Sequence, residues 1–154
     1  MNNTFTFGGH TFDFVGILQP ELENGKIFIE NSSSKFENIN NLPYNKYGEG
    51  YFCRFELPNS QEKPGVFLWV ADNRVLYLGY SNNMRSCFKF YGKIAPSSCW
   101  IPGPSTDCKL NKVALQAFLN NKEIKIYFKE TKDYKKIKSE ILQKEKTIYN
   151  EKYL

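Results

Sequence analysis

Two apolar runs separated by a short polar turn constrain the fold of this chain more than any other feature. The runs are Gly65–Val70 and Arg74–Gly79, and residues 71–73 lie between them. Runs rich in β-branched and aromatic residues and bounded by turn-forming residues are typical of the two strands of a hairpin. If all three intervening residues form the turn, the register places Phe67 directly opposite Tyr77.

Further strands are predicted on the N-terminal side of this hairpin. Thr4–Phe14 alternates aromatic and polar residues on both sides of Gly8-Gly9, a two-residue turn that predicts a second hairpin. Short strands are expected over Lys26–Glu30 and Tyr51–Leu57, and the Asn- and Ser-rich stretch from Asn31 to Asn45 is expected to be a loop. Pro58–Pro64 has the composition of a linker and is the expected domain boundary.

Helices alternate with one more strand on the C-terminal side. Polar residues before apolar ones at helical spacing predict the helices, and strict alternation predicts the strand. The expected elements are a helix capped by Asn82 or Asn83 and running to Phe90, a loop over Gly92–Asp107, a helix over Leu110–Asn120, a strand over Lys122–Thr131 and a basic amphipathic helix over Asp133–Lys146.

These elements predict an α/β protein of the α+β kind, with a small mixed or antiparallel sheet flanked by helices. Residues 64–154 form the expected β-β-α-α-β-α core, and residues 1–63 form a β-rich extension. The total of 154 residues corresponds to one ordinary domain, and 41% hydrophobic with 24% charged residues excludes a disordered or fibrous chain.

The positive charge is concentrated in the second half of the chain. Residues 1–80 carry 6 Lys and Arg against 9 Asp and Glu, whereas residues 81–154 carry 15 against 7. The net charge of +5 is therefore the sum of −3 and +8, and the basic half is the candidate surface for a phosphate-bearing partner.

The location and the thiol chemistry follow from simple features. We expect a soluble, cytoplasmic protein, because the chain has neither an apolar run of membrane-spanning length nor a basic and then apolar leader. The four cysteines form no CxxC pair, so reduced, buried thiols are favoured over disulfides, a zinc site or a cysteine nucleophile.

Several short strings together resemble the GIY-YIG nuclease family over residues 64–154. Gly65-Val66-Phe67 and Tyr77-Leu78-Gly79 look like the two name-giving tripeptides, and Ser81–Phe88 looks like the turn and first helix that follow them. Glu140-Ile-Leu142 and Tyr149-Asn150 look like the helix-borne glutamate and the terminal asparagine of the family.

The resemblance implies a DNA endonuclease that depends on Mg²⁺ or Mn²⁺. Glu140 would hold the metal, Tyr77 would help to deprotonate the attacking water, and an arginine of the first helix would stabilise the phosphate. A carboxylate is a suitable ligand for Mg²⁺, which lowers the pKa of a bound water and neutralises developing charge. Gly65, Gly79 and Asn150 would have structural roles.

Two positions depart from the family pattern. Phe67 replaces the tyrosine of the first tripeptide, and Cys87 occupies the position of the family arginine. Arg85 is the nearest guanidinium, but two residues along a helix turn it by about 200° to another face. Lys93 or Lys109 could supply the missing charge, and losing one charge-stabilising donor slows a reaction by about 10²–10³.

Three functions therefore stay open. The first is a slow or rearranged nuclease, the second is a catalytically inactive module that binds nucleic acid, and the third is a protein-interaction domain with a similar sheet. For the first two, DNA is the expected partner, and a duplex cutter with one site per chain is expected to work as a homodimer. The lysines expected to contact DNA are Lys89, Lys93, Lys109, Lys112 and Lys136.

Overall fold

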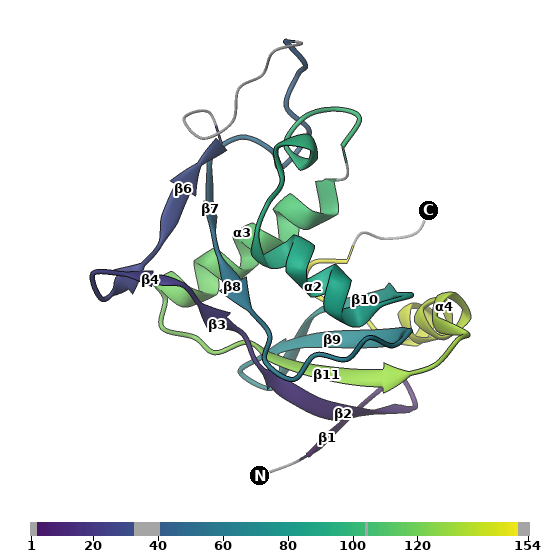
Figure 1. Ribbon diagram of the computed structural model, residues 1–154. Coiled ribbons are helices and arrows are strands. Elements are labelled where there is room, and N and C mark those ends of the chain that lie inside the picture. Colours follow the sequence, from purple (N-terminus) through teal and green to yellow (C-terminus); the bar gives the residue numbers. More distant parts are fainter. Residues whose placement is uncertain (1–2, 33–40, 104, 151–154) are drawn as a thin grey trace. The chain divides into compact units, whose positions relative to one another are not determined.

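The computed structural model describes residues 3–32, 41–103 and 105–150, so residues 33–40 of the expected loop lie outside it (Figure 1). Contacts group the chain into two units, each assembled from separate stretches of sequence. The first unit comprises Met1–Leu18, Leu57–Cys87 and Glu123–Leu154, and the second comprises Gln19–Glu56 and Phe88–Lys122. These contacts place the N-terminal hairpin in the same unit as the strands that follow Pro64, and the division expected after residue 63 stays a sequence-based prediction.

A five-stranded antiparallel sheet forms the centre of the first unit (Figure 1). The strands are hydrogen-bonded in the order β1-β2-β11-β9-β10, and every neighbouring pair is antiparallel. The N-terminal hairpin therefore extends the sheet. The strand bounds are β1 (Thr4–Phe7), β2 (His10–Ile17), β9 (Gly65–Ala71), β10 (Arg74–Ser81) and β11 (Lys125–Glu130).

The predicted hairpin at Gly8-Gly9 is confirmed. Phe7 pairs with His10, which leaves the two glycines as the turn, and both have positive φ values of 58° and 80°. Two-residue turns of this kind match the twist of the flanking strands and favour glycine. A Cβ on Gly8 would also lie only 2.7 Å from Cγ2 of Ile141. Both the positive φ and this close approach therefore favour glycine at position 8.

The turn between β9 and β10 is shorter than predicted. Arg74 pairs with Ala71, so only Asp72 and Asn73 form the turn, with φ values of 52° and 61°. Asparagine and aspartate tolerate this left-handed conformation, which a two-residue hairpin turn needs at both central positions.

The predicted register of this hairpin is wrong as a result. The pairing shifts again between Val75 and Tyr77, so that Tyr77 lies opposite Trp69, and Phe67 lies opposite Gly79. A bulge adds one residue to one strand and moves every later pair. The sequence pattern could not reveal the shift. Both strands are apolar on both faces, so no alternation of polar and apolar residues fixes their register.

Helix α4 (Tyr134–Lys144) packs on one face of this sheet. Ile141 is fully buried there, and Ile137 and Leu142 pack against the same core. The helix begins and ends within two residues of the predicted bounds, because its apolar positions repeat at helical spacing. The other buried members of this core are Phe12, Val66, Leu68, Val70, Val75, Leu78 and Tyr127.

The second unit combines short strand pairs with helices. Helix α3 (Ser105–Leu119) packs against β7, and helix α2 (Met84–Gly92) crosses from the first unit into the second after Cys87. A 3-10 helix, η1, covers Pro96–Ser98. The strand pairs are β3 (Gln19–Pro20) with β8 (Phe55–Glu56), β4 (Leu22–Glu23) with β5 (Lys26–Ile27), and β6 (Ile29–Asn31) with β7 (Tyr51–Cys53).

One buried asparagine ties the second unit together. Asn111 of α3 accepts a hydrogen bond from the Cys53 amide at 2.9 Å and donates to the Cys53 carbonyl at 2.9 Å. Its amide nitrogen also donates to the Tyr91 carbonyl at 2.8 Å. Asn111 is fully buried, and the three bonds satisfy its side chain and the outer edge of β7 together.

The predicted fold class is confirmed, since the protein is a mixed α+β structure with an antiparallel sheet and the expected element order from residue 65 onward. The strand predicted over Tyr51–Leu57 is divided at Arg54, because β7 pairs with β6 whereas β8 pairs with β3. Helix α3 begins at Ser105, earlier than the predicted Leu110. The prediction missed this first turn because its residues are mostly polar and lack the apolar repeat. In the described part of the chain, no helix combines the length and apolarity that a membrane crossing requires.

Candidate nucleic-acid interface

Phe67 and Tyr77, the aromatic residues of the two tripeptides, are both buried in the sheet. Phe67 is 0% exposed and Tyr77 is 8% exposed. Their ring centroids lie 6.5 Å apart, a diagonal contact that follows from the pairing of Tyr77 with Trp69. A phenol that takes part in hydrolysis must meet water and substrate, and little of the Tyr77 side chain is open to either.

The side chain of Tyr77 does not join the core beneath α4. Leu68 and Leu78 pair across β9 and β10 and belong to the core that contains Ile141 of α4. Neighbouring residues of a strand point to opposite faces, so Tyr77 belongs with Trp69 on the other face of the sheet.

Helix α4 directs Lys138 toward β10. Lys138 Nζ lies 4.9 Å from the ring centroid of Tyr80 and 6.0 Å from that of Tyr77. Glu140 follows two positions later, about 200° around the helix. Its Oε2 atom lies 3.7 Å from His10 Nε2 on β2, and β11 and β9 separate β2 from β10 in the sheet. The structure therefore does not bring Glu140 and Tyr77 together.

Glu140, the expected magnesium ligand, lies beside an imidazole. Mg²⁺ takes octahedral oxygen ligands, usually one or two carboxylates with water and phosphate oxygens. Glu140 is 44% exposed, and the group at ion-pair distance is the imidazole of His10, a ligand better suited to softer metals. Among residues 3–32, 41–103 and 105–150, no cluster of three or more His, Cys, Asp or Glu side chains could hold a metal.

The first helix places Cys87 and Arg85 in different surroundings. Asn83 caps α2 by accepting a hydrogen bond from the Ser86 amide at 3.1 Å, which confirms the predicted start of the helix. Arg85 donates to the Ser60 carbonyl at 2.7 and 3.1 Å and lies 3.9 Å from Glu62. Cys87 is partly buried. The guanidinium of Arg85 faces the 60–62 segment.

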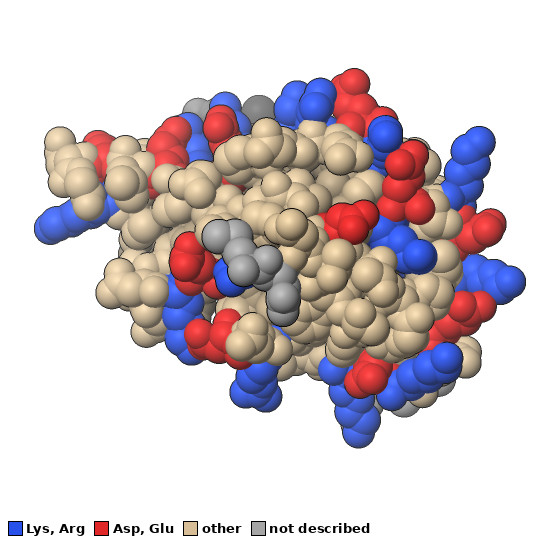
Figure 2. Space-filling view, turned by 90° about the horizontal axis from the view of Figure 1, so that it is seen from below, with Lys and Arg blue, Asp and Glu red and all other residues tan. Residues whose placement is uncertain are grey.

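The lysines predicted to contact DNA are divided between the two units. Lys136 lies on α4, whereas Lys89, Lys93, Lys109 and Lys112 belong to the second unit. Figure 2 shows Lys and Arg interspersed with Asp and Glu around the margin of one face.

Two of the second-unit lysines contact nearby protein groups. Lys112 donates to the Glu49 carbonyl and lies 5.1 Å from the ring centroid of Phe52, and burial lowers the pKa of Lys112. Lys109 Nζ lies 5.9 Å from the ring centroid of Tyr47. Both ammonium groups thus lie beside aromatic rings of the second unit.

Gly65, Gly79 and Asn150 occupy crowded backbone positions. A Cβ on Gly65 would lie 2.2 Å from the Lys129 carbonyl oxygen, and one on Gly79 would lie 2.4 Å from Cζ of Phe67. Asn150 hydrogen-bonds to the backbone of Leu78. All three residues thus contact other parts of the first unit.

The sequence interpretation missed an aromatic and basic cluster on the edge of the sheet. Tyr80 of β10 stacks on Tyr134 of α4 with ring centroids 5.4 Å apart and an interplanar angle of 17°, and Lys138 lies beside the same ring. Tyr134 and Lys138 are one helical turn apart, which the sequence does reveal. Their shared contact with Tyr80 depends on which strand the helix meets, and the sequence does not reveal that.

Comparisons with protein-family models, curated proteins and solved structures found no match to this chain. The resemblance to GIY-YIG nucleases consequently rests on the sequence strings alone.

Proposed function

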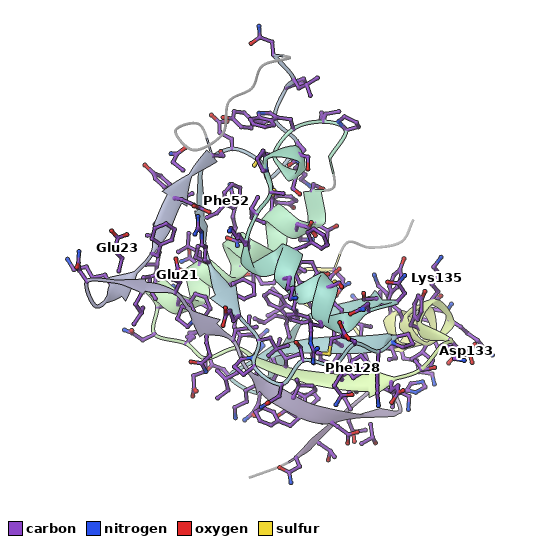
Figure 3. All side chains as sticks on the ribbon, viewed as in Figure 1. Glu21, Glu23, Phe52, Phe128, Asp133 and Lys135 are labelled. Atoms are coloured by element: carbon purple, nitrogen blue, oxygen red, sulfur yellow. The ribbon has the colours of Figure 1, made fainter. Side chains whose placement is uncertain are left out.

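We propose that this protein is a non-cleaving nucleic-acid-binding module that contacts phosphates through helix α4. The observation that carries the proposal is the charge of this helix, since four of its 11 residues are lysines and one is acidic. Lys135, Lys136 and Lys144 are exposed. Lys132 and Lys146 add two exposed lysines just outside the helix, beyond the capping residues Asp133 and Glu145. Figure 3 shows Lys135 on the outer side of α4, near the start of the helix.

The absence of cleavage in this proposal follows from where the side chains lie. Lys138 occupies the position near Tyr77 that the nuclease interpretation assigns to Glu140, and a cation there would repel Mg²⁺. The Glu140 carboxylate faces His10, and Arg85 is bonded to Ser60. These three placements favour binding over hydrolysis.

Binding is tested by a salt titration with fluorescein-labelled DNA of about 20 nucleotides, single-stranded and duplex. The double variant Lys135→Glu/Lys136→Glu should lose affinity for both forms, and the slope of log affinity against log salt should fall by about 1–2. Lys26→Glu/Lys122→Glu carries the same charge change on exposed residues of the second unit and should bind as the wild type does. Salt-independent, negligible affinity of the wild type would overturn the proposal and favour a protein-interaction domain.

Cleavage is tested separately by incubation of plasmid DNA with Mg²⁺ or Mn²⁺. The wild type and Cys87→Arg should both leave the plasmid intact, because an added arginine does not move Glu140 to Tyr77. Nicking that Glu140→Ala abolishes would instead establish the nuclease alternative.

A further inference from the structure

We propose that Tyr80 is a stacking platform for an unpaired base, so that the module prefers single-stranded nucleic acid over duplex. This inference rests on the proposed function and adds the class of ligand. It is carried by the contact of three side chains, Tyr80 from the sheet and Tyr134 and Lys138 from α4.

Two side chains of α4 contact the Tyr80 ring. Tyr134 and Lys138 are four residues apart, so they lie side by side on α4, and both contact the ring from the helix. Tyr80 nevertheless stays 38% exposed. The near-parallel stack on Tyr134, with an interplanar angle of 17°, fixes the plane of the ring.

A fixed aromatic face beside lysines is what single-strand binding needs. Base–aromatic stacking accepts any base, and lysines alongside neutralise the neighbouring phosphates. Lys138 lies within 4.9 Å of the ring centroid, and Lys135 lies one turn earlier on the helix and is exposed. One base on Tyr80 would thus have cations on the α4 side for its flanking phosphates.

Duplex DNA cannot use this platform in the same way. Each base in a duplex has both faces covered by its stacked neighbours, so an aromatic ring can take only a base that has left the stack. The lysines of α4 attract the phosphates of either form. Tyr80 therefore supplies selectivity, and the helix supplies the affinity that both forms share.

The experiment compares affinities for a labelled thymidine 20-mer and a 20-base-pair duplex at one salt concentration. Tyr80→Ala should weaken single-strand binding by about 5- to 100-fold, as base stacking predicts, and should change duplex binding less than about twofold. Tyr80→Phe keeps the ring and should lose far less than Tyr80→Ala. Tyr51→Ala, which removes a tyrosine that is 60% exposed in the second unit, is the matched control and should bind as the wild type does.

Folding and binding are separated by a further variant and a spectroscopic readout. Tyr80→Leu keeps an apolar contact with Tyr134 without an aromatic face, so it should fold with an unchanged circular dichroism spectrum and still lose single-strand preference. Single-strand binding should quench tyrosine fluorescence in the wild type and much less in Tyr80→Leu. Equal loss on both DNA forms, or full single-strand affinity in Tyr80→Leu, would overturn the platform while Lys135→Glu/Lys136→Glu still reports on the proposed function.

Discussion

The side-chain amide of Asn150 pairs with both backbone polar groups of Leu78. Oδ1 accepts the Leu78 amide at 2.7 Å, and Nδ2 donates to the Leu78 carbonyl at 2.9 Å. Leu78 lies on β10, the last strand in the sheet order, so these groups point away from the sheet. Thr147 Oγ1 donates to the same Oδ1 at 2.5 Å and accepts from the Asn150 amide at 3.0 Å. Asn150 thereby replaces a neighbouring strand at one residue and ties the segment after α4 to the edge of the sheet.

Removing this amide should destabilise the first unit. Asn150→Ala leaves both backbone groups of Leu78 without their partner, and we expect a loss of about 1–3 kcal/mol in the free energy of unfolding. Urea denaturation measures the loss, and hydrogen exchange of the Leu78 amide locates it. Asn82→Ala, at an exposed position, is the control. Unchanged exchange at Leu78 in Asn150→Ala would contradict the role of the amide.

The observed register makes a specific prediction about Gly79. Gly79→Ala places a methyl group 2.4 Å from the buried Phe67 ring, so we expect a loss of about 1–3 kcal/mol from overpacking. Phe67→Leu should be destabilising alone yet offset part of the Gly79→Ala loss in the double variant, because the smaller side chain makes room. Strictly additive losses in this cycle would show that the two residues do not face each other.

The elements were predictable because each has a local signal. The glycines at positions 8 and 9, the cap at Asn83 and the apolar repeat of α4 each specify a turn or a helix without help from distant residues. Hairpins between consecutive strands and the order of the helices along the chain follow from such local signals. The α+β class follows from that order of elements.

The site was less predictable because it depends on pairing between distant residues. The bulge after Val75 moved Tyr77 away from Phe67, and no residue type marks it. The orientation of α4 sends Glu140 to His10 and Lys138 to β10, although both lie near the same apolar stripe. A two-residue difference along a helix decides which chemistry faces the sheet, and only the tertiary structure selects it.

The ion pair of Arg54 with Glu30 should contribute more to the stability of the second unit than the ion pair of Arg54 with Glu21. Arg54 donates to both carboxylate oxygens of Glu30 at 2.8 and 3.3 Å, and only 6% of the Glu30 side chain is exposed. Glu30→Ala leaves a partly buried guanidinium without its partner, so we expect a loss of about 2–4 kcal/mol in urea denaturation. Glu21, which is 51% exposed and 4.0 Å from the same guanidinium, provides the control. Glu21→Ala should lose less than about 1 kcal/mol, and equal losses at the two positions would refute the distinction.

Alkaline pH should weaken the second unit through Cys53. Burial raises the pKa of this thiol to about 12 from an ordinary value of 9.0. A pKa raised in the folded state means that the stability is fully present below pH 9 and is lost as the pH rises toward 12, because the unfolded chain releases the proton first. At pH 10.5 the free energy of unfolding should therefore have fallen by about 2 kcal/mol because of this thiol, at 1.36 kcal/mol for each pH unit.

Urea denaturation of the wild type and Cys53→Ala at pH 7.5, 9 and 10.5 should show the difference between their free energies of unfolding shrinking only above pH 9. Phe52→Leu, a core change without a titrating group, should keep a constant difference from the wild type, and a constant difference for Cys53→Ala as well would exclude the buried thiol as the cause.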